Sequence, residues 1–196
     1  MDFINIIKDV DTDLFLFLNS KNSVFFDVLM YWVSNKLFWV PLYLFFLFLV
    51  YKKVGKQFWL VALAAAVLIL LSDQISVHAF KNVFLRLRPC HNLLIQSKVH
   101  LLHNHCGGTY GFVSSHAANT FALAMFLGLF FRGTIKYFSL FIFCWATLVA
   151  YSRIYSGVHY PADVAVGAIV GMGIGVAVFK IYVFSQNKIF KTGLKH

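Results

Sequence analysis

The chain has 196 residues, of which 60% are hydrophobic and 18% aromatic, and its formal net charge is +10. This length predicts a single domain, residues 1–196, and this composition excludes an ordinary soluble protein and indicates an integral membrane protein. The Lys and Arg residues lie mostly between apolar runs, which argues against a continuous nucleic-acid-binding stripe and favours basic loops on the cytoplasmic side of a membrane.

The N-terminal residues predict short helices at the membrane surface. Residues 9–19 place three Asp among Leu and Phe, and this segment is typical of an interfacial helix. Residues 24–34 are apolar apart from Asp27, but they make up only about half of the length that a spanning helix needs. We expect a second interfacial or re-entrant piece here, although residues 14–34 taken together could form a sixth span. The N-terminus lacks the pattern of a cleaved signal peptide.

Five apolar segments follow, and they predict an all-α membrane bundle with about five spans. The segments cover residues 37–51, 57–80, 115–131, 136–153 and 161–184. Basic residues cluster after the first, third and fifth segments, which should share the cytoplasmic side. These residues are Lys52, Lys53, Lys56, Arg132, Lys136, Lys188, Lys191 and Lys195. The loop 88–113 and the N-terminus should then lie on the opposite side.

The loop 88–113 contains Cys90, Cys106 and four His residues. Outside the cytoplasm a disulfide between the two cysteines is the favoured state. A zinc site built from these His and Cys residues is an alternative, although the spacing matches no familiar ligand pattern. Free thiols are the third possibility.

Three glycines in the last segment, Gly167, Gly171 and Gly175, recur every four residues. Such a row of small residues permits close approach of a second helix. We expect that helix to belong to the same molecule rather than to a dimer partner.

Residues 152–163 gather a guanidinium, an imidazole and a carboxylate between the last two spans. If the chain turns at Ser156-Gly157 and a helix begins at Pro161, Asp163 can reach back to one ring nitrogen of His159. The other nitrogen would then be free as a nucleophile, and Arg153 offers a planar set of donors suited to a phosphate. Alternatively, these polar residues only cap and anchor two helix ends.

Two further motifs stand upstream. Lys81 and Arg88-Pro89 have the spacing K-x6-R-P, which puts both cations on one face if the helix continues. Val113-Ser114-Ser115-His116 opens the third apolar segment, and Ser114 suits the N-cap of a helix whose free N–H groups could bind a phosphate.

Together with S-R-x5-H-x3-D at residues 152–163, these motifs resemble the signature of the type 2 phosphatidic acid phosphatase family. That family includes membrane lipid phosphatases and vanadium-dependent haloperoxidases. Its middle motif is usually P-S-G-H, and here Val113 and Ser115 replace the Pro and the Gly.

The resemblance implies a role for each matching residue. His159 is the expected nucleophile that becomes phosphorylated, Asp163 orients it, and His116 protonates the leaving oxygen and then activates water. The expected phosphate-binding residues are Lys81, Arg88, Ser114, Ser115 and Arg153. Taken alone, the cations could instead reach anionic lipid head groups, and His116 could be a hydrogen-bonding residue at a helix start.

The acidic residues are seven Asp and no Glu, and Asp163 is the one that lies within the motifs. A two-metal phosphatase needs several converging carboxylates or histidines, so we expect catalysis without a metal or other cofactor.

The resemblance implies a lipid phosphatase of the bacterial inner membrane, with its site facing the periplasm or the cell exterior. The small single-domain chain resembles bacterial members that act on undecaprenyl pyrophosphate. Lipid A and phosphatidylglycerophosphate are the alternative substrates. Two alternatives belong to other functional classes. One is a vanadate-dependent oxidation catalyst, and the other is a non-enzymatic protein that binds or transports lipid phosphates. We expect membrane lipids and a lipid phosphate as binding partners, with no nucleic acid and no required protein partner.

Overall fold

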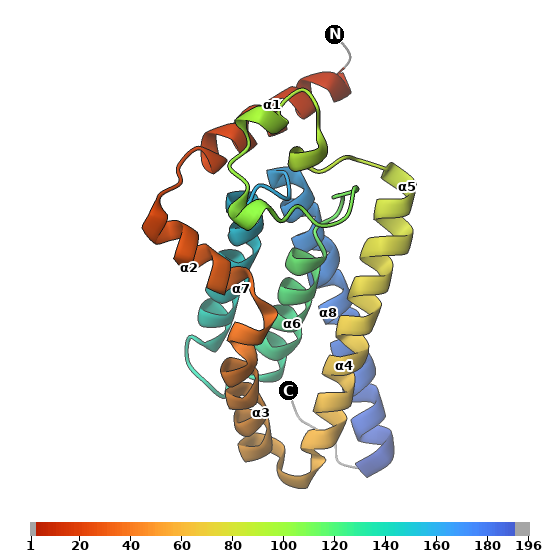
Figure 1. Ribbon diagram of the computed structural model, residues 1–196. Coiled ribbons are helices and arrows are strands. Elements are labelled where there is room, and N and C mark those ends of the chain that lie inside the picture. The colour runs from red at the N-terminus through yellow and green to blue at the C-terminus, as the bar shows by residue number, and fades with distance from the viewer. Residues whose placement is uncertain (1–2, 191–196) are drawn as a thin grey trace.

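A computed structural model describes residues 3–190 of the chain, and the expected C-terminal lysines Lys191 and Lys195 lie outside this range. The described residues form a helical bundle with no β-strand, which confirms the all-α membrane fold (Figure 1). The helices are α1 (Phe3–Asn19), α2 (Val24–Ser34), α3 (Val40–Val54), α4 (Phe58–Gln74), α5 (Asn82–Phe84), α6 (Ser115–Phe130), α7 (Phe138–Tyr155) and α8 (Pro161–Phe190). A π-helical turn, Ile75–Lys81, joins α4 to α5.

Within residues 3–190, three segments are long and apolar enough to cross a membrane: Lys36–Phe84, Phe138–Tyr155 and Pro161–Ile189. The first folds back on itself where Gly55 adopts a left-handed backbone (φ 58°), so it supplies both α3 and α4. With the shorter α6, five helices run along the bundle, as the hydropathy pattern predicts (Figure 1).

Helix α6 is the centre of the bundle, and it packs against α4, α7 and α8. Its contact with α8 depends on the glycine row. A Cβ added to Gly167 would lie 2.8 Å from the carbonyl oxygen of Ser114, and one added to Gly175 would lie 2.6 Å from that of Ala122. These separations are too short for a Cβ, so the two backbones touch directly. The glycine row therefore serves packing within the monomer, as expected.

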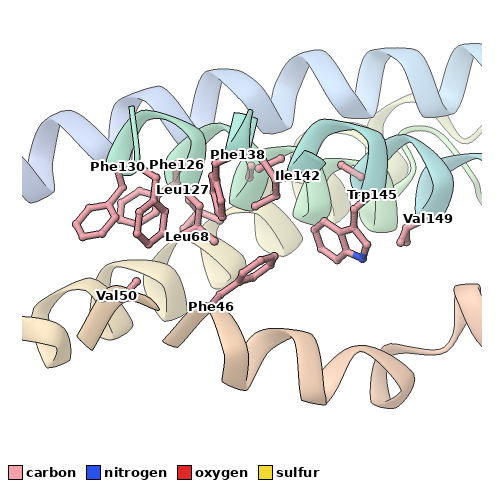
Figure 2. Packing of buried hydrophobic residues seen from close by; sticks show 14 of the residues in the cluster. Phe46, Val50, Leu68, Phe126, Leu127, Phe130, Phe138, Ile142, Trp145 and Val149 are labelled. Carbon is pink, nitrogen blue, oxygen red and sulfur yellow. The ribbon is translucent and has the colours of Figure 1, made fainter. Parts of the chain in front are cut away.

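Aromatic and branched side chains fill the space between α3, α6 and α7 (Figure 2). Phe46 of α3 meets Trp145 and Phe138 of α7 edge to face, with ring centroids 6.4 and 5.8 Å apart. Because lipid is as apolar as these side chains, their close packing, rather than removal from water, holds the helices together.

The N-terminal helices are separate pieces, so residues 14–34 do not form a sixth span. Helix α1 lies across one end of the bundle and α2 descends beside it (Figure 1). Asn19 is buried at the end of α1, where its amide donates to the carbonyl oxygen of Tyr155 at 2.8 Å and its Oδ1 accepts from His100 N–H at 2.7 Å. One side chain thus joins α1, the end of α7 and the loop that connects α5 to α6 (the outer loop).

Candidate active site

Lys81 and Arg88 do not share a helical face, contrary to the expectation from their spacing. The helix ends at Phe84, and Leu85 adopts a left-handed backbone (φ 48°) that turns the chain away. Arg88 then lies in extended backbone immediately before a 3₁₀ turn. Its guanidinium donates to the carbonyl oxygens of Tyr110 and Cys106, at 3.3 and 3.2 Å.

A short antiparallel bridge closes the outer loop on itself. Leu87 pairs with Tyr110, and Gly111 N–H donates to the carbonyl oxygen of Arg86 at 2.9 Å. The bridge brings the K-x6-R-P segment beside the residues that lead into α6. The first two motifs are therefore neighbours in space.

Gly111 marks the point where three predicted site residues converge. A Cβ added there would lie 3.1 Å from Arg88 Cγ, 3.2 Å from Asp163 Oδ2 and 3.5 Å from His159 Nδ1. A larger residue would push these groups apart, so Gly111 belongs to the site. It lies outside all three motifs, so no sequence pattern indicated this position.

His159 and Asp163 lie on either side of the start of α8. Helix α7 ends at Tyr155, Gly157 turns the chain with φ 77°, and α8 begins at Pro161. His159 Nδ1 lies 3.5 Å from Asp163 Oδ2, which is longer than a normal hydrogen bond. Catalytic hydrogen bonds are often long without substrate and tighten in the complex.

The environment of His159 favours the neutral imidazole. Its side chain is 2% exposed, and this burial, together with the positive charges of Arg88, Arg153 and Lys81, holds its pKa well below the ordinary value. An imidazole without its proton can act as a nucleophile at neutral pH. The same three cations that act on His159 are the ones that the motifs predict for phosphate binding.

Arg86 and Asp11 complete the surroundings of Asp163, and neither was expected. Arg86 Nη1 donates to Asp163 Oδ1 at 2.8 Å, and Arg86 Nη2 donates to Asp11 Oδ2 at 2.6 Å. Asp163 Oδ2 accepts from Tyr160 N–H at 3.0 Å, and Asp11 Oδ1 accepts from Ala162 N–H at 2.8 Å. Both oxygens of each carboxylate are thus held, and α1 is tied to the start of α8.

The second motif begins helix α6. Ser114 is buried at its N-cap, where its Oγ accepts from Ala117 N–H and its own N–H donates to the carbonyl oxygen of Asp163 at 3.0 Å. Lys81 Nζ donates to Ser115 Oγ at 2.8 Å. Ser115, which replaces the usual Gly, therefore fixes the ammonium group beside the first turn of α6.

Arg153 reaches toward the end of α2. Its Nη1 donates to Ser34 Oγ, while its buried Nε has no hydrogen-bond partner in the structure. An unpaired buried donor is costly, and an anion beside it would remove that cost. His116 and Arg153 line the same cavity.

Cys90 and Cys106 form a disulfide, with a Cα separation of 6.0 Å. Among the described residues, Cys90, His91 and Cys106 are the one group close enough together to hold a metal ion. Because the two sulfurs are bonded to each other, they offer no thiolate ligands. The disulfide also lies beside Arg88, whose guanidinium bonds the Cys106 carbonyl oxygen.

The site therefore combines three cations, an imidazole held neutral beside a carboxylate, and a second imidazole at the start of α6. This set can bind a phosphate dianion, attack its phosphorus and transfer a proton to a leaving oxygen.

The chain is similar to two lipid A 4′-phosphatases. The one from Porphyromonas gingivalis is 37% identical over 93% of this chain and 77% of the relative. The one from Bacteroides thetaiotaomicron is 39% identical over 86% of this chain and 75% of the relative.

Two solved structures share the fold. Aquifex aeolicus LpxE superposes with a TM-score of 0.62 at 24% identity, covering 86% of this chain and 94% of that one. A PAP2-type phosphatidylglycerolphosphate phosphatase from Bacillus subtilis gives 0.64 at 19% identity, covering 97% and 90%.

The model of the PAP2 superfamily matches residues 60–187, a stretch that contains all three motifs. With the curated relatives, this match shows that the chain is an integral membrane phosphatase that belongs to the PAP2 superfamily.

Proposed function

We propose that this enzyme hydrolyses a phosphate monoester of lipid A and releases inorganic phosphate. The proposal rests on the similarity of nearly the whole chain to two lipid A 4′-phosphatases. This similarity favours lipid A over undecaprenyl pyrophosphate, the substrate expected from the small single-domain chain.

An apolar cavity beside the site fits an acyl chain. It has a volume of about 510 Å³ and lies between α3, α4, α6 and α7, with walls that include Tyr43, Phe46 and Leu123. His116 lies at its boundary. An acyl chain in this cavity would bring the attached head group to His116.

In the first half of the reaction, the phosphate oxygens lie among Lys81, Arg88 and Arg153. The Nε2 atom of His159 attacks phosphorus as the bond from phosphorus to the lipid oxygen breaks. His116 gives its proton to that oxygen, so the lipid leaves as an alcohol. Asp163 holds Nδ1–H of His159 and offsets the charge that develops on the ring.

In the second half, His116 takes a proton from a water molecule that attacks the phosphohistidine. The bond from nitrogen to phosphorus breaks, inorganic phosphate leaves, and His159 is neutral again. Neither half of the proposed reaction requires a metal ion, because the side chains of Lys81, Arg88 and Arg153 stabilise the charge on the phosphate oxygens.

The site faces the periplasm in this proposal. A disulfide persists in an oxidising compartment, and Cys90–Cys106 lies in the same loop as Arg88. Two basic turns lie at the opposite end of the bundle: the turn between α3 and α4 contains Lys56, and the turn between α6 and α7 contains Arg132 and Lys136. Positive residues of this kind mark the cytoplasmic side of a membrane.

The test measures phosphate release by purified enzyme in detergent with EDTA, from lipid A, undecaprenyl pyrophosphate and phosphatidylglycerophosphate. We expect the highest kcat/KM with lipid A, and mass-spectrometric fragmentation should locate the lost phosphate at the 4′ position.

Rapid quench and peptide mapping should find acid-labile phosphate on His159. His159→Gln should be inactive and unlabelled, while His116→Ala should still form phosphoenzyme from an aryl phosphate but release phosphate slowly.

Faster turnover of undecaprenyl pyrophosphate would refute the substrate. Phosphate mapped to His116 would reverse the two histidine roles, and loss of activity with EDTA would show that a metal takes part.

A further inference from the structure

Two cavities that differ in polarity meet at His116. The apolar cavity between α3, α4, α6 and α7 lies on one side. The second has a volume of about 570 Å³ and lies between the end of α2, the outer loop and the end of α7. His116 and Ser34 line both cavities. A lipid phosphate at His116 thus has an apolar space on one side and a polar space on the other.

The polar cavity carries hydroxyl, amide and imidazole groups beside an aromatic ring. Its walls include Tyr31 and Asn35 from the end of α2, His103 and His105 from the outer loop, and Arg153 from α7. The rings of Tyr31 and His103 lie against each other, with centroids 4.5 Å apart and planes inclined by 56°. Side chains of this kind hydrogen-bond to several hydroxyl groups and present a flat surface to a ring.

The loop holds His103 in an unusual backbone conformation. His103 and its neighbour Asn104 both have φ of 53°, in the left-handed region that residues with a Cβ rarely adopt. The 3₁₀ turn that contains them, Leu102–Asn104, is attached to the end of α7 by Leu102 N–H, which faces the carbonyl oxygen of Ser156 at 3.5 Å. Strained backbone is typical of segments that position a side chain for binding.

We propose that the polar cavity is a subsite for the sugar that carries the scissile phosphate, with Tyr31, His103 and His105 as specificity-determining residues. The proposal rests on the proposed function, because lipid A is a phosphorylated glucosamine disaccharide. The volume lies within the range of about 300–1,000 Å³ that small-molecule sites have. A polyprenyl pyrophosphate has no sugar, and it would leave the hydroxyl and amide groups of this cavity unused.

The experiment compares two substrates across single substitutions. His103→Ala, His105→Ala and Tyr31→Phe are assayed on lipid A and on phosphatidic acid, which has the phosphate monoester but no sugar. We expect kcat/KM on lipid A to fall about tenfold for each variant, as expected for a lost hydrogen bond. Activity on phosphatidic acid should stay within about twofold of the wild type.

The control is His78→Ala, which removes an exposed histidine on the π-helical turn. It should leave both activities unchanged. Equal losses on both substrates would show that the substituted residues serve the phosphate or the fold, and unchanged activity on both would show that no sugar binds there. Either outcome overturns the subsite.

A binding arm separates this proposal from the proposed function. The deacylated glucosamine disaccharide of lipid A is added as an inhibitor of phosphatidic acid hydrolysis. We expect competitive inhibition of the wild type and at least tenfold weaker inhibition of His103→Ala, in agreement with the substrate arm. If the wild type fails to hydrolyse lipid A but shows this inhibition, the subsite stands and the function falls. If it hydrolyses lipid A but the disaccharide does not bind, the function stands and the subsite falls.

Discussion

Arg86 links two carboxylates that come from opposite ends of the chain. Its guanidinium bonds Asp163 and Asp11 and lies 4.0 Å from the centre of the Tyr160 ring. Asp163 is fully buried, and a buried carboxylate needs a partner to remain charged. We therefore infer that Arg86 supports the proposed reaction through Asp163, which in turn orients His159.

Arg86→Gln should lower kcat about ten- to hundredfold, by analogy with the loss of side chains that orient metal-bound ligands. KM should change little, because both Nη atoms of Arg86 are bonded to carboxylates rather than left free for the phosphate. In an Asp163→Asn background the same substitution should have a much smaller effect, since the interaction that it removes is already broken. Steady-state kinetics of the four proteins in this cycle measure the coupling.

Two further variants decide between positioning and general stability. Arg86→Lys retains the positive charge and should recover part of kcat, whereas Arg132→Gln, an exposed arginine after α6, should behave as the wild type. Additive effects of Arg86→Gln and Asp163→Asn would show that Arg86 does not act through Asp163.

The sequence predicted the residues that carry motifs and missed those that support them. The positive charges of Lys81, Arg88 and Arg153, which the motifs contain, all lower the pKa of His159. Asp11 lies 152 positions from Asp163, so no spacing rule could pair them, and Arg86 can bond both carboxylates only because of how α1 crosses the bundle. Gly111 likewise acquires its role only when the outer loop folds back through the Leu87–Tyr110 bridge.

Helix α8 contains glycines in two different environments. Gly171 faces α6, and a Cβ added there would overlap the carbonyl oxygen of Ala118. Gly173 lies two residues further along, and a Cβ added there would meet no atom within 4 Å. The four-residue spacing predicted the packed face, because residues four apart lie on one side of a helix.

Gly171→Ala should destabilise the protein by about 1–3 kcal/mol, the usual cost of overpacking, because a backbone carbonyl cannot move aside as a side chain can. Gly173→Ala should be neutral or slightly stabilising, since alanine is the better helix former. Thermal unfolding in detergent, followed by circular dichroism, measures the difference. A Gly171→Ala variant as stable as Gly173→Ala would show that α6 and α8 can separate without loss of packing energy.

Helix ends were predicted less well than helix interiors. Apolar runs predicted the five helices of the bundle, because each must satisfy its backbone within the segment. The left-handed turn at Leu85 carried no signal, since it uses neither Gly nor Asn. The assumption of a continuous helix from Lys81 to Arg88 therefore failed, although both residues still reach the site.

The bundle has two ends of different chemistry. The three motifs, the disulfide and α1 lie at one end. At the other end, Lys53 of α3 donates to Thr134 between α6 and α7, and Gln186 of α8 donates to Gln57 at the start of α4. These contacts gather the basic turns on one side. Hydropathy and charge alone predicted this separation, because alternating spans place the turns after the first and third segments on one side and the loops that carry the three motifs on the other.

Labelling with a membrane-impermeant maleimide tests the orientation. In a Cys144→Ser background, Lys21→Cys probes the segment between α1 and α2, while Lys56→Cys and Lys136→Cys probe the two basic turns. In intact spheroplasts we expect Lys21→Cys to react and the other two to react only after permeabilisation, because positively charged turns are expected on the cytoplasmic side. The Cys90–Cys106 pair should stay unreactive until a reductant is added, since an oxidising compartment maintains the disulfide.

The reverse labelling pattern would place the phosphate site in the cytoplasm, where that disulfide would not persist. Labelling of Lys21→Cys and Lys56→Cys from the same side would contradict the five-helix crossing itself.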